Sequence, residues 1–480
     1  MDLSLVPAEQ CGSWQSNTIH EPRRLEDHVI RVSRDGNMLN VRDRETIHSE
    51  EQAKEALNHM MCEAELLARS KGSSKVRILI YAHGGLNSYG STDERILEDH
   101  QALKMMNEDD EWYYPIYISW DSSLQTSYPE HIFRLREGYK SNILVGVPTS
   151  LVVFPSDILT TVGRYPATVT YQAINDKNRF ASIRYAPWLN GAWKNALLKM
   201  CDGRLCEGDK RFSGDSSPLE ANLSSYFKDS GWRQAGRATY DILSLPVRYT
   251  VGSIYHSAIA SSSWNVMKRR AVMPYYPASY FDGRWESGVS GGQVFPAVLS
   301  RARASKQYDY ELTLVGHSMG TMVMNEALTR YRKAFLAGDE LQNIVYMAAA
   351  ADIGDSMAAL KPILVANGAA RSEPVNFYNL TLNRVAEVAE MHWLGALPTG
   401  SLLVSIDQHH EHPEHPVRRT LGSEVNVLTA IEELDEAFRG AKGDLVFKAF
   451  DRKPGEYPRH HADFSKMDFW RSDVWQLPGS

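Results

Sequence analysis

The sequence has few cysteines, no long apolar run and no excess of basic charge. Four cysteines are too few for a disulfide scaffold, so reduced thiols are expected, although Cys201 and Cys206 could bridge a short loop. No stretch reaches the roughly 18 uncharged apolar residues that a membrane-spanning helix needs. Lys and Arg number 52 against 59 Asp and Glu, which excludes a basic nucleic-acid-binding protein.

Internal repeats, low-complexity tracts and an apolar N-terminal signal are also lacking. Residues 1–10 (MDLSLVPAEQ) begin with an acidic residue at position 2 and contain no apolar run of the kind found in a secretory signal. A cytoplasmic protein is therefore expected. The least polar stretch, residues 141–156, is uncharged but contains Pro148 and Pro155. We expect it to line a pocket or to rest on a membrane surface rather than to cross one. With 480 residues, of which 43% are hydrophobic and 23% charged, the chain has an ordinary globular composition.

Strand-like and helix-like segments alternate in two parts of the chain. β-Branched apolar runs bounded by turn residues indicate buried strands, and amphipathic segments between them indicate helices. The expected strands are residues 76–81, 114–120, 312–315, 343–347, 375–380 and 444–450. Helices are expected over residues 319–335, 425–438 and 464–475, and a short helical patch over residues 229–245. This alternation predicts an α/β fold with a mostly parallel sheet and helices on both faces.

The break in the alternation predicts the domain organisation. Residues 1–45 form an N-terminal extension with a hairpin around Asp35-Gly36, and residues 46–121 and 299–480 form the two parts of one α/β core. Residues 122–298, rich in Tyr, Trp, Ser and Pro, interrupt that core. Insertions of this length are usually functional, and we expect a cap over the carboxyl ends of the strands that forms an apolar pocket.

The pattern G-x-S-x-G, typical of a nucleophilic serine, occurs at residues 316–320 (GHSMG). A strand-like segment precedes Ser318 and a helix-like segment follows it, which is the setting of a nucleophile elbow. The pattern also occurs at residues 288–292 (GVSGG), but no strand precedes Ser290. The context therefore favours Ser318 as the nucleophile.

A nucleophilic serine needs hydrogen-bond donors for the oxyanion that it creates. One donor in such sites is the backbone N–H of the residue after the serine, here Met319. The second comes from a loop after an earlier strand, and residues 83–86 (HGGL) follow the strand at residues 76–81. We therefore expect the amides of Leu86 or Gly85, together with that of Met319, to form an oxyanion hole.

These motifs resemble those of the α/β-hydrolase superfamily, in particular bacterial serine hydrolases of unknown function. Such proteins carry H-G-x-N after a strand, W-x-S after the next, H-S-M-G at the elbow and A-A-x-D-I after the following strand. The corresponding segments here are residues 83–89 (HGGLNSY), one residue longer, then 120–122 (WDS), 317–320 and 349–353 (AAADI). The resemblance covers residues 76–125 and 305–470 and implies an α/β-hydrolase fold with a serine-histidine-acid triad.

The triad histidine is expected after the last core strand. His461 matches the H-x-[DE]-[YF] register of the superfamily, with His460 as the second candidate. Asp352 matches the family's A-A-x-D-I aspartate and is the expected acid, although the same position also suits a helix N-cap. At the later acid position Asn383 stands in place of an aspartate, so Asp355, Glu387 and Glu390 are further candidates for the acid.

Two further patterns are given less weight. Residues 409–415 (HHEHPEH) could hold a metal, but Pro413 and Pro416 rule out a regular helix, so a solvated loop is expected and no metal is assigned. Residues 268–270 (KRR) could contact anionic lipid head groups.

The sequence thus predicts a serine hydrolase of the carboxylic ester class, lipase-like or carboxylesterase-like. It would act on a small-molecule or lipid ester or thioester through an acyl-enzyme, without a cofactor or nucleic-acid partner and with peripheral membrane contact through the cap. Amidase and acyltransferase chemistry use the same triad. The competing hypothesis is a non-catalytic binding protein with the same fold, and Asn383 is the residue that favours it.

Overall fold

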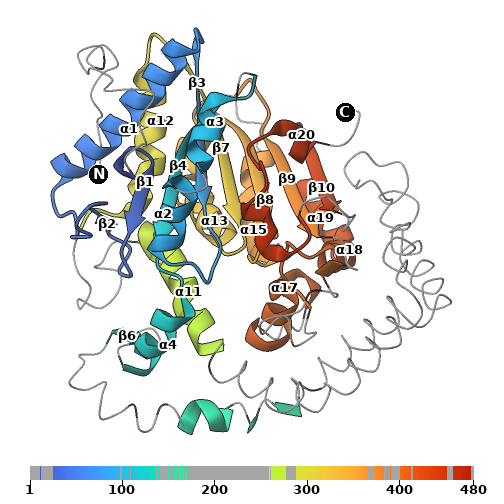
Figure 1. The fold of residues 1–480 in the computed structure, drawn as a ribbon. Helices are drawn as coiled ribbons and strands as arrows, with labels where there is room; N and C mark the ends of the chain where they lie inside the picture. Colours follow the sequence, from blue (N-terminus) through green and yellow to red (C-terminus); the bar gives the residue numbers. More distant parts are fainter. Residues whose placement is uncertain are drawn as a thin grey trace, which may run out of the picture.

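The computed structural model is built around one eight-stranded sheet that has helices on both faces (Figure 1). The structure describes residues 25–97, 100–108, 110–133, 261–276, 288–365, 371–382, 400–411, 415–450 and 458–476, together with Cys11, Ala386, Glu387, Glu390 and scattered positions between 135 and 169 and at 259. Within these residues, no helix combines the length and the apolar character that crossing a bilayer requires.

The strand order in the sheet is β10-β9-β8-β7-β3-β4-β1-β2, and all neighbours pair in parallel except β2, which is antiparallel to β1. This confirms the predicted α/β class and mostly parallel sheet. The strands are β1 Val29–Val32, β2 Met38–Leu39, β3 Lys75–Ala82, β4 Tyr114–Trp120, β7 Asp309–His317, β8 Leu341–Met347, β9 Asn376–Leu382 and β10 Leu445–Phe450. A separate two-stranded ribbon joins β5 Leu135–Arg136 to β6 Tyr139–Lys140.

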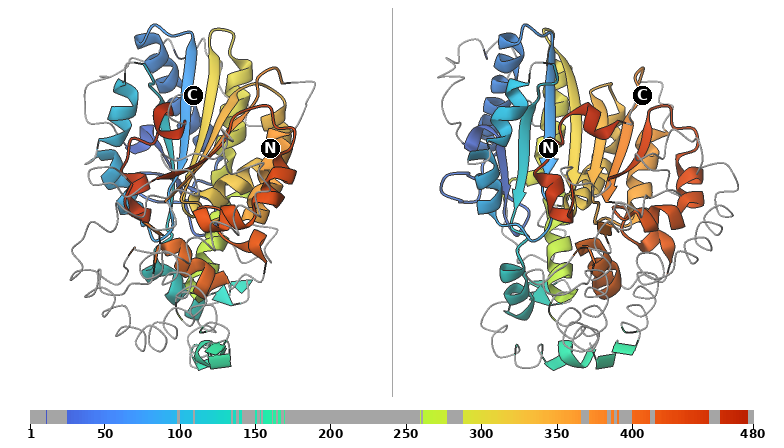
Figure 2. Two further views of the ribbon diagram at one scale, coloured as in Figure 1. Left: turned by 90° about the vertical axis from the view of Figure 1, so that its right-hand side faces the viewer. Right: turned by 45° about the vertical axis from the view of Figure 1, so that its right-hand side comes forward.

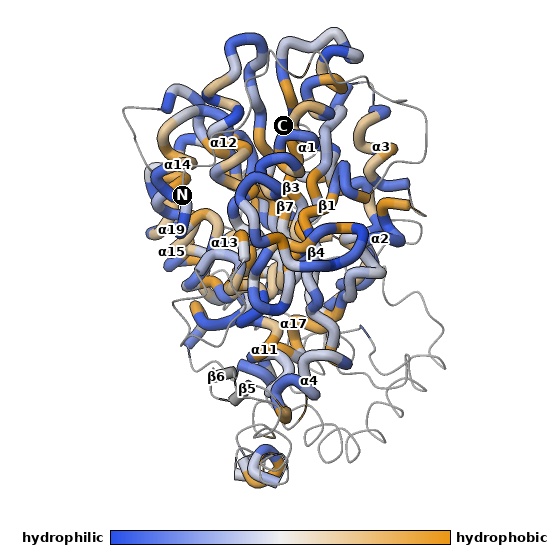
Figure 3. Tube along the Cα trace, turned by 90° about the vertical axis from the view of Figure 1, so that its left-hand side faces the viewer, coloured by the Kyte–Doolittle hydropathy of each residue, from blue (hydrophilic) through white to orange (hydrophobic). Residues whose placement is uncertain are grey.

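A connection between two parallel strands of one sheet is right-handed. The helix in that connection therefore lies on one face when the chain moves toward one edge of the sheet, and on the other face when it moves toward the opposite edge. α2 and α3 join β3 to β4 and pack on β4, whereas α12, α13, α15 and α19 cover the opposite face (Figure 2). The helices are α1 Glu50–Ser70, α2 Tyr89–Leu97, α3 Gln101–Asn107, α4 Leu124–Phe133, α11 Ser261–Val272, α12 Val294–Ala304, α13 Gly320–Arg330, α14 Arg332–Leu336, α15 Ile353–Leu364, α17 Leu402–Ser405, α18 Glu424–Thr429, α19 Ile431–Phe438 and α20 Ser472–Trp475. The apolar residues concentrate along the central strands between these layers (Figure 3).

Several elements differ from the expectation in their limits. The helix expected over residues 319–335 is divided into α13 and α14, and the one expected over residues 425–438 into α18 and α19. The predicted hairpin around Asp35-Gly36 is confirmed, with Gly36 in the left-handed region at φ +81°, but β1 also joins the main sheet beside β4. The helix expected over residues 464–475 is reduced to the 3₁₀ turn η10, His461–Ser465, and the single turn α20.

The described part of the insertion meets the core at the carboxyl ends of the strands (Figure 1). α11 packs on both α4 and α13. The buried Arg270 of α11 donates to the backbone carbonyl of Asp121, 2.7 Å away, and forms an ion pair with Glu130 of α4. This guanidinium holds the end of the insertion against the segment that follows β4. The patch expected at residues 229–245 and most of residues 141–156 lie outside the described residues.

A disulfide joins Cys11 to Cys62 of α1, so the expectation of reduced thiols is wrong for these two residues. Cys201 and Cys206 lie outside the described residues. Beside the disulfide, Arg301 of α12 donates to Cys11 Sγ at 3.0 Å and forms a buried ion pair with Glu65 of α1 at 2.9 Å. Cys11 is thereby held where α1 packs on α12.

We predict that reducing the Cys11–Cys62 disulfide lowers the free energy of unfolding by about 2–4 kcal/mol, because the bond closes a long loop in the unfolded chain. The two cysteines are 51 positions apart. Chemical denaturation with and without a reductant measures the change. A peptide map without reductant should show the Cys11 and Cys62 peptides joined; separate peptides and an unchanged midpoint would contradict the prediction.

Candidate functional site

Ser318 lies on a strained turn between β7 and α13, as the sequence predicts. Its φ is +51°, a left-handed conformation that is unfavourable for a residue with a Cβ. Backbone hydrogen bonds on both sides hold it: Ser318 N–H donates to Met347 O at 2.8 Å, and Ser318 O accepts from Ala350 N–H at 3.0 Å. The neighbouring strand β8 and the loop after it therefore fix the strained residue in place.

The two glycines of the motif are sterically required. A Cβ on Gly320 would lie 2.0 Å from the carbonyl oxygen of Ala82, at the end of β3, and a Cβ on Gly316 would lie 2.9 Å from Cα of Thr321. The absence of both side chains lets α13 start close to the sheet. Ser290, in the competing match, caps a 3₁₀ turn at φ −62° and donates to the carbonyl of Pro274. That arrangement lacks the strand-turn-helix geometry.

The structure brings Ser318 and His461 together. His461 Nε2 lies 2.9 Å from Ser318 Oγ. Both residues are buried, with His461 6% and Ser318 2% exposed. His461 begins the 3₁₀ turn η10, which follows the last strand, β10. His460 is exposed, and its backbone N–H donates to the carboxylate of Asp463. The side chain at the serine is therefore that of His461.

Both backbone groups of His461 are held by buried side chains. Its N–H donates to the two carboxylate oxygens of Glu390, at 3.1 and 3.3 Å. Its carbonyl accepts from His317 Nε2–H at 3.2 Å, so the residue just before the nucleophile holds the backbone of the histidine. The two contacts fix the backbone of His461 on both sides of its Cα. Glu390 is thus the carboxylate that the described residues place at His461.

The structure does not bring Asp352 to His461. Asp352 is the N-cap of α15: one carboxylate oxygen accepts from Asp355 N–H at 2.6 Å, and the other pairs with Arg418 at 3.2 Å. Among the described residues no contact joins Asp352 to the histidine. Burial raises the pKa of the Asp352 carboxyl, and the charge of Asp355 adds to the effect. The expected aspartate is a helix cap because a side chain at this position folds back onto its own helix.

Asp355 and Glu387 are likewise engaged away from the histidine. Asp355 is exposed and pairs with Arg418 at 3.0 Å. Glu387 is buried and accepts from Ser423 Oγ at 2.7 Å, and burial raises its pKa well above the ordinary value for Glu. Asn383 lies outside the described residues.

The predicted oxyanion loop lies against the elbow, but the structure changes the choice of donor. A Cβ on Gly84 would lie 3.0 Å from Cβ of Ser318, and one on Gly85 3.5 Å from the side chain of Met319. Leu86 N–H donates to Ser122 O at 3.0 Å and is therefore used within the loop. Gly85 and Met319, in contrast, donate their N–H groups to no other described residue. Leu86 as a donor is the part of the expectation that the structure corrects.

His83 ties this loop to the end of β4. Its ring stacks on Trp120 with centroids 4.0 Å apart. Nδ1–H donates to Gly84 O at 2.7 Å, and Nε2 accepts from Trp120 N–H at 3.2 Å, which fixes the neutral tautomer. Asn87 adds a hydrogen bond from Nδ2 to the same Gly84 carbonyl at 2.8 Å. Hydrogen bonds thus join the two sequence motifs HGGLN and WDS to each other, next to Ser318.

Both structural histidines of the site are neutral. Burial lowers the pKa of His83 to about 3 and that of His317 to about 3, because the charged ring would lose its hydration. They act as fixed hydrogen-bonding groups, which the sequence analysis did not predict. Their places in the HGGLN motif and directly before Ser318 are the signal that could have found them.

We predict that the His83 and His317 rings remain neutral between pH 8 and pH 5. Since burial lowers both pKa values from 6.5 to about 3, protonation requires a pH far below this range. ¹⁵N-detected NMR of the imidazole nitrogens measures it, with free histidine in the same sample as the reference. Protonation of either ring above pH 5 would contradict the assignment.

The histidine run at residues 409–415 does not form the expected loop throughout. Residues Ile406–Glu411 form a π-helical turn, η8, in which Glu411 pairs with Lys268 of α11 at 2.5 Å. The ring of His410 lies beside Trp264, with centroids 5.7 Å apart. In the described part of the chain no group of three or more His, Cys, Asp or Glu side chains could hold a metal ion.

Comparisons of the chain with protein-family models, with curated proteins and with solved structures found no match. The interpretation of the site therefore depends on its geometry.

Proposed function

We propose that the protein is a serine hydrolase that cleaves a carboxylic ester. The observation that carries the proposal is the contact of Ser318 Oγ with His461 Nε2 at 2.9 Å, with the serine held on a strained strand-turn-helix elbow. A serine hydroxyl is a weak nucleophile until a base takes its proton, and an imidazole nitrogen at hydrogen-bonding distance is that base. Neighbouring buried histidines are neutral and engaged with the backbone, so His461 is the ring available for proton transfer.

The proposed reaction has two halves. Ser318 Oγ attacks the ester carbonyl carbon as its proton passes to His461 Nε2, which gives a tetrahedral oxyanion. Collapse of this intermediate breaks the bond to the alcohol, which leaves with the proton from His461, and the acyl group stays on Ser318. Water then attacks the acyl-enzyme by the same route, its proton passing through His461 to Ser318 as the acid is released.

The N–H groups of Gly85 and Met319 are the proposed oxyanion donors. Both belong to backbone that packs against Ser318, and neither donates to another described residue. Fixed donors of this kind stabilise the developing charge more than water does, and each is worth about 10²–10³ in kcat.

Glu390 is the proposed acid. What supports this assignment is that its carboxylate accepts from the backbone N–H of His461; in the proposed role it would also accept from Nδ1–H, orient the ring and stabilise its charged form. The chain order of Ser318, Glu390 and His461 is the order typical of α/β-hydrolases, and Glu390 follows the strand β9, two strands after the nucleophile strand β7. We therefore assign the core to the α/β-hydrolase fold.

This assignment weakens the hypothesis of a non-catalytic binding protein. That hypothesis depended on Asn383 having replaced the acid, whereas Glu390 supplies a carboxylate seven positions later. The ester class, a lipid ester included, and the contact of the cap with a membrane stay predictions. So does the cytoplasmic location, against which the Cys11–Cys62 disulfide argues.

Ser318→Ala should lower kcat/KM for p-nitrophenyl esters by about 10³-fold or more, because the members of a triad act as a unit. A series of acyl chains from acetate to palmitate, with the release of p-nitrophenolate as readout, finds the preferred substrate and measures the loss. Circular dichroism shows whether each variant is folded.

Ser290→Ala is the matched control, since it removes the same oxygen from the competing G-x-S-x-G match. It should keep the wild-type rate within about twofold, because the described contact of Ser290 Oγ is to the carbonyl of Pro274 and not to Ser318 or His461. Equal losses in the two variants, or no hydrolysis of any ester by the folded wild-type protein, would count against the proposed function.

Glu390→Gln should lower kcat by about 10²-fold or more with little change in KM, because glutamine can still accept from His461 N–H but carries no charge to stabilise the imidazolium. Asp352→Asn is the matched control. Asparagine also caps helices, so this variant should stay near the wild-type rate. Steady-state kinetics on one ester decides between the two acids: a severe loss in Asp352→Asn with Glu390→Gln unaffected would reverse the assignment.

A further inference from the structure

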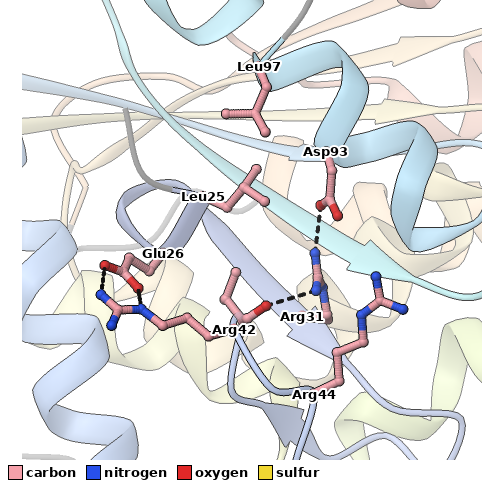
Figure 4. Close-up of a pocket in the computed structure, with 8 residues that line it drawn as sticks. Leu25, Glu26, Arg31, Arg42, Arg44, Asp93 and Leu97 are labelled. Atoms are coloured by element: carbon pink, nitrogen blue, oxygen red, sulfur yellow. Dashed lines mark hydrogen bonds and ion pairs between the residues drawn. The ribbon is translucent and has the colours of Figure 1, made fainter. Parts of the chain in front are cut away.

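A cavity lies at the edge of the sheet formed by β1 and β2, and none of the proposed catalytic residues lines it. Its volume is about 610 Å³, within the range of small-molecule pockets (Figure 4). It lies between the 3₁₀ turn η2 (Leu25–Asp27), β1, the segment after β2, and α2. The lining residues are Leu25, Glu26, Arg31, Val41, Arg42, Arg44, Asp93 and Leu97.

The charges of this cavity do not balance. Of its three arginines, Arg42 forms a two-point ion pair with Glu26, and Arg31 forms an ion pair with Asp93 at 2.6 Å. Arg44 forms no ion pair with any described residue. The cavity therefore carries one positive charge more than its own carboxylates compensate.

The excess charge lies beside a buried cation that is itself incompletely satisfied. The guanidinium carbons of Arg31 and Arg44 lie 5.3 and 5.7 Å from the centroid of the same ring, Tyr89. The Arg31 side chain is 2% exposed, and its Nε is buried without a hydrogen-bond partner. Two like charges thus share one aromatic ring while Asp93 compensates only one of them. Arg44 itself is exposed, so an anion that enters the cavity from solvent can pair with it and balance the charge.

The backbone holds Arg44 at the cavity in an unfavourable conformation. Its φ is +64°, a left-handed value that costs a side-chain-bearing residue roughly 1–2 kcal/mol. Hydrogen bonds from Arg44 N–H to Asn40 O at 3.0 Å and from Asn40 N–H to Glu45 O at 2.9 Å close the turn that maintains it. Strain of this kind is concentrated at ligand-binding positions.

The rest of the cavity wall is aliphatic, from Leu25 and Leu97, which Figure 4 labels, and from Val41. Leu97 is 41% exposed, so a large apolar side chain faces the solvent at this cavity. We propose that this cavity binds a small amphiphilic monoanion, a carboxylate on an aliphatic chain. The carboxylate pairs with the planar guanidinium of Arg44, and the chain contacts the three aliphatic side chains. The proposal is independent of the reaction at Ser318.

Isothermal titration calorimetry with sodium decanoate tests the proposal on the wild-type protein and on Arg44→Gln. Wild-type binding should weaken as salt is added, because the contact is ionic. Arg44→Gln should bind at least about tenfold more weakly, since it removes the one uncompensated charge. Inorganic phosphate and decanol, which each supply half of the chemistry, should both bind more weakly than decanoate.

Arg439→Gln is the matched control, because it removes one positive charge from an exposed position at the end of α19, outside the cavity. It should bind decanoate as the wild-type protein does. Equal affinity of wild type and Arg44→Gln, or Arg44-dependent binding of phosphate without binding of decanoate, would overturn the proposal. Ester hydrolysis by Arg44→Gln, measured in parallel, should match the wild type, so failure of the proposed hydrolase does not affect this result.

Discussion

The left-handed backbone of Ser318 is the constraint on which the site depends. A serine at φ +51° projects its Oγ away from the end of β7, and hydrogen bonds to β8 and to the loop after it hold the residue in this conformation. Gly316 and Gly320 are required by the same turn, since a Cβ on either would overlap the backbone of α13 or β3. The roughly 1–2 kcal/mol stored at one residue is offset by the packing of the whole parallel sheet.

From that turn, hydrogen bonds to the backbone position the other groups. His317 holds the carbonyl of His461, Glu390 holds its N–H, and His83 holds the carbonyl of Gly84 in the oxyanion loop. Burial keeps His83 and His317 neutral, so they give direction without adding charge near the serine. The proposed base is thus positioned partly by the residue next to the nucleophile.

The sequence predicts what local patterns determine. The strands are apolar runs between turns, Ser318 stands in a motif that a strand precedes and a helix follows, and His461 follows the last strand in a recognisable register. Glu390 reaches the site through a hydrogen bond to a backbone amide 71 positions away, and such a contact leaves no residue pattern. For Asp352 the sequence pattern is present but ambiguous. A position directly after a strand suits both a catalytic acid and a helix N-cap, and Asp352 is the N-cap of α15. The pairing of Cys11 with Cys62 is likewise a contact between residues 51 positions apart, which no local pattern determines.

The central claim is that the folded protein activates Ser318 as a nucleophile. Reaction with a fluorophosphonate, followed by mass spectrometry of the digested protein, tests it without knowledge of the substrate. The account predicts one phosphonyl adduct, on the peptide that contains Ser318, which forms on native protein and is lost after heat denaturation. An adduct on Ser290, or no adduct on protein that is folded by circular dichroism, would contradict it.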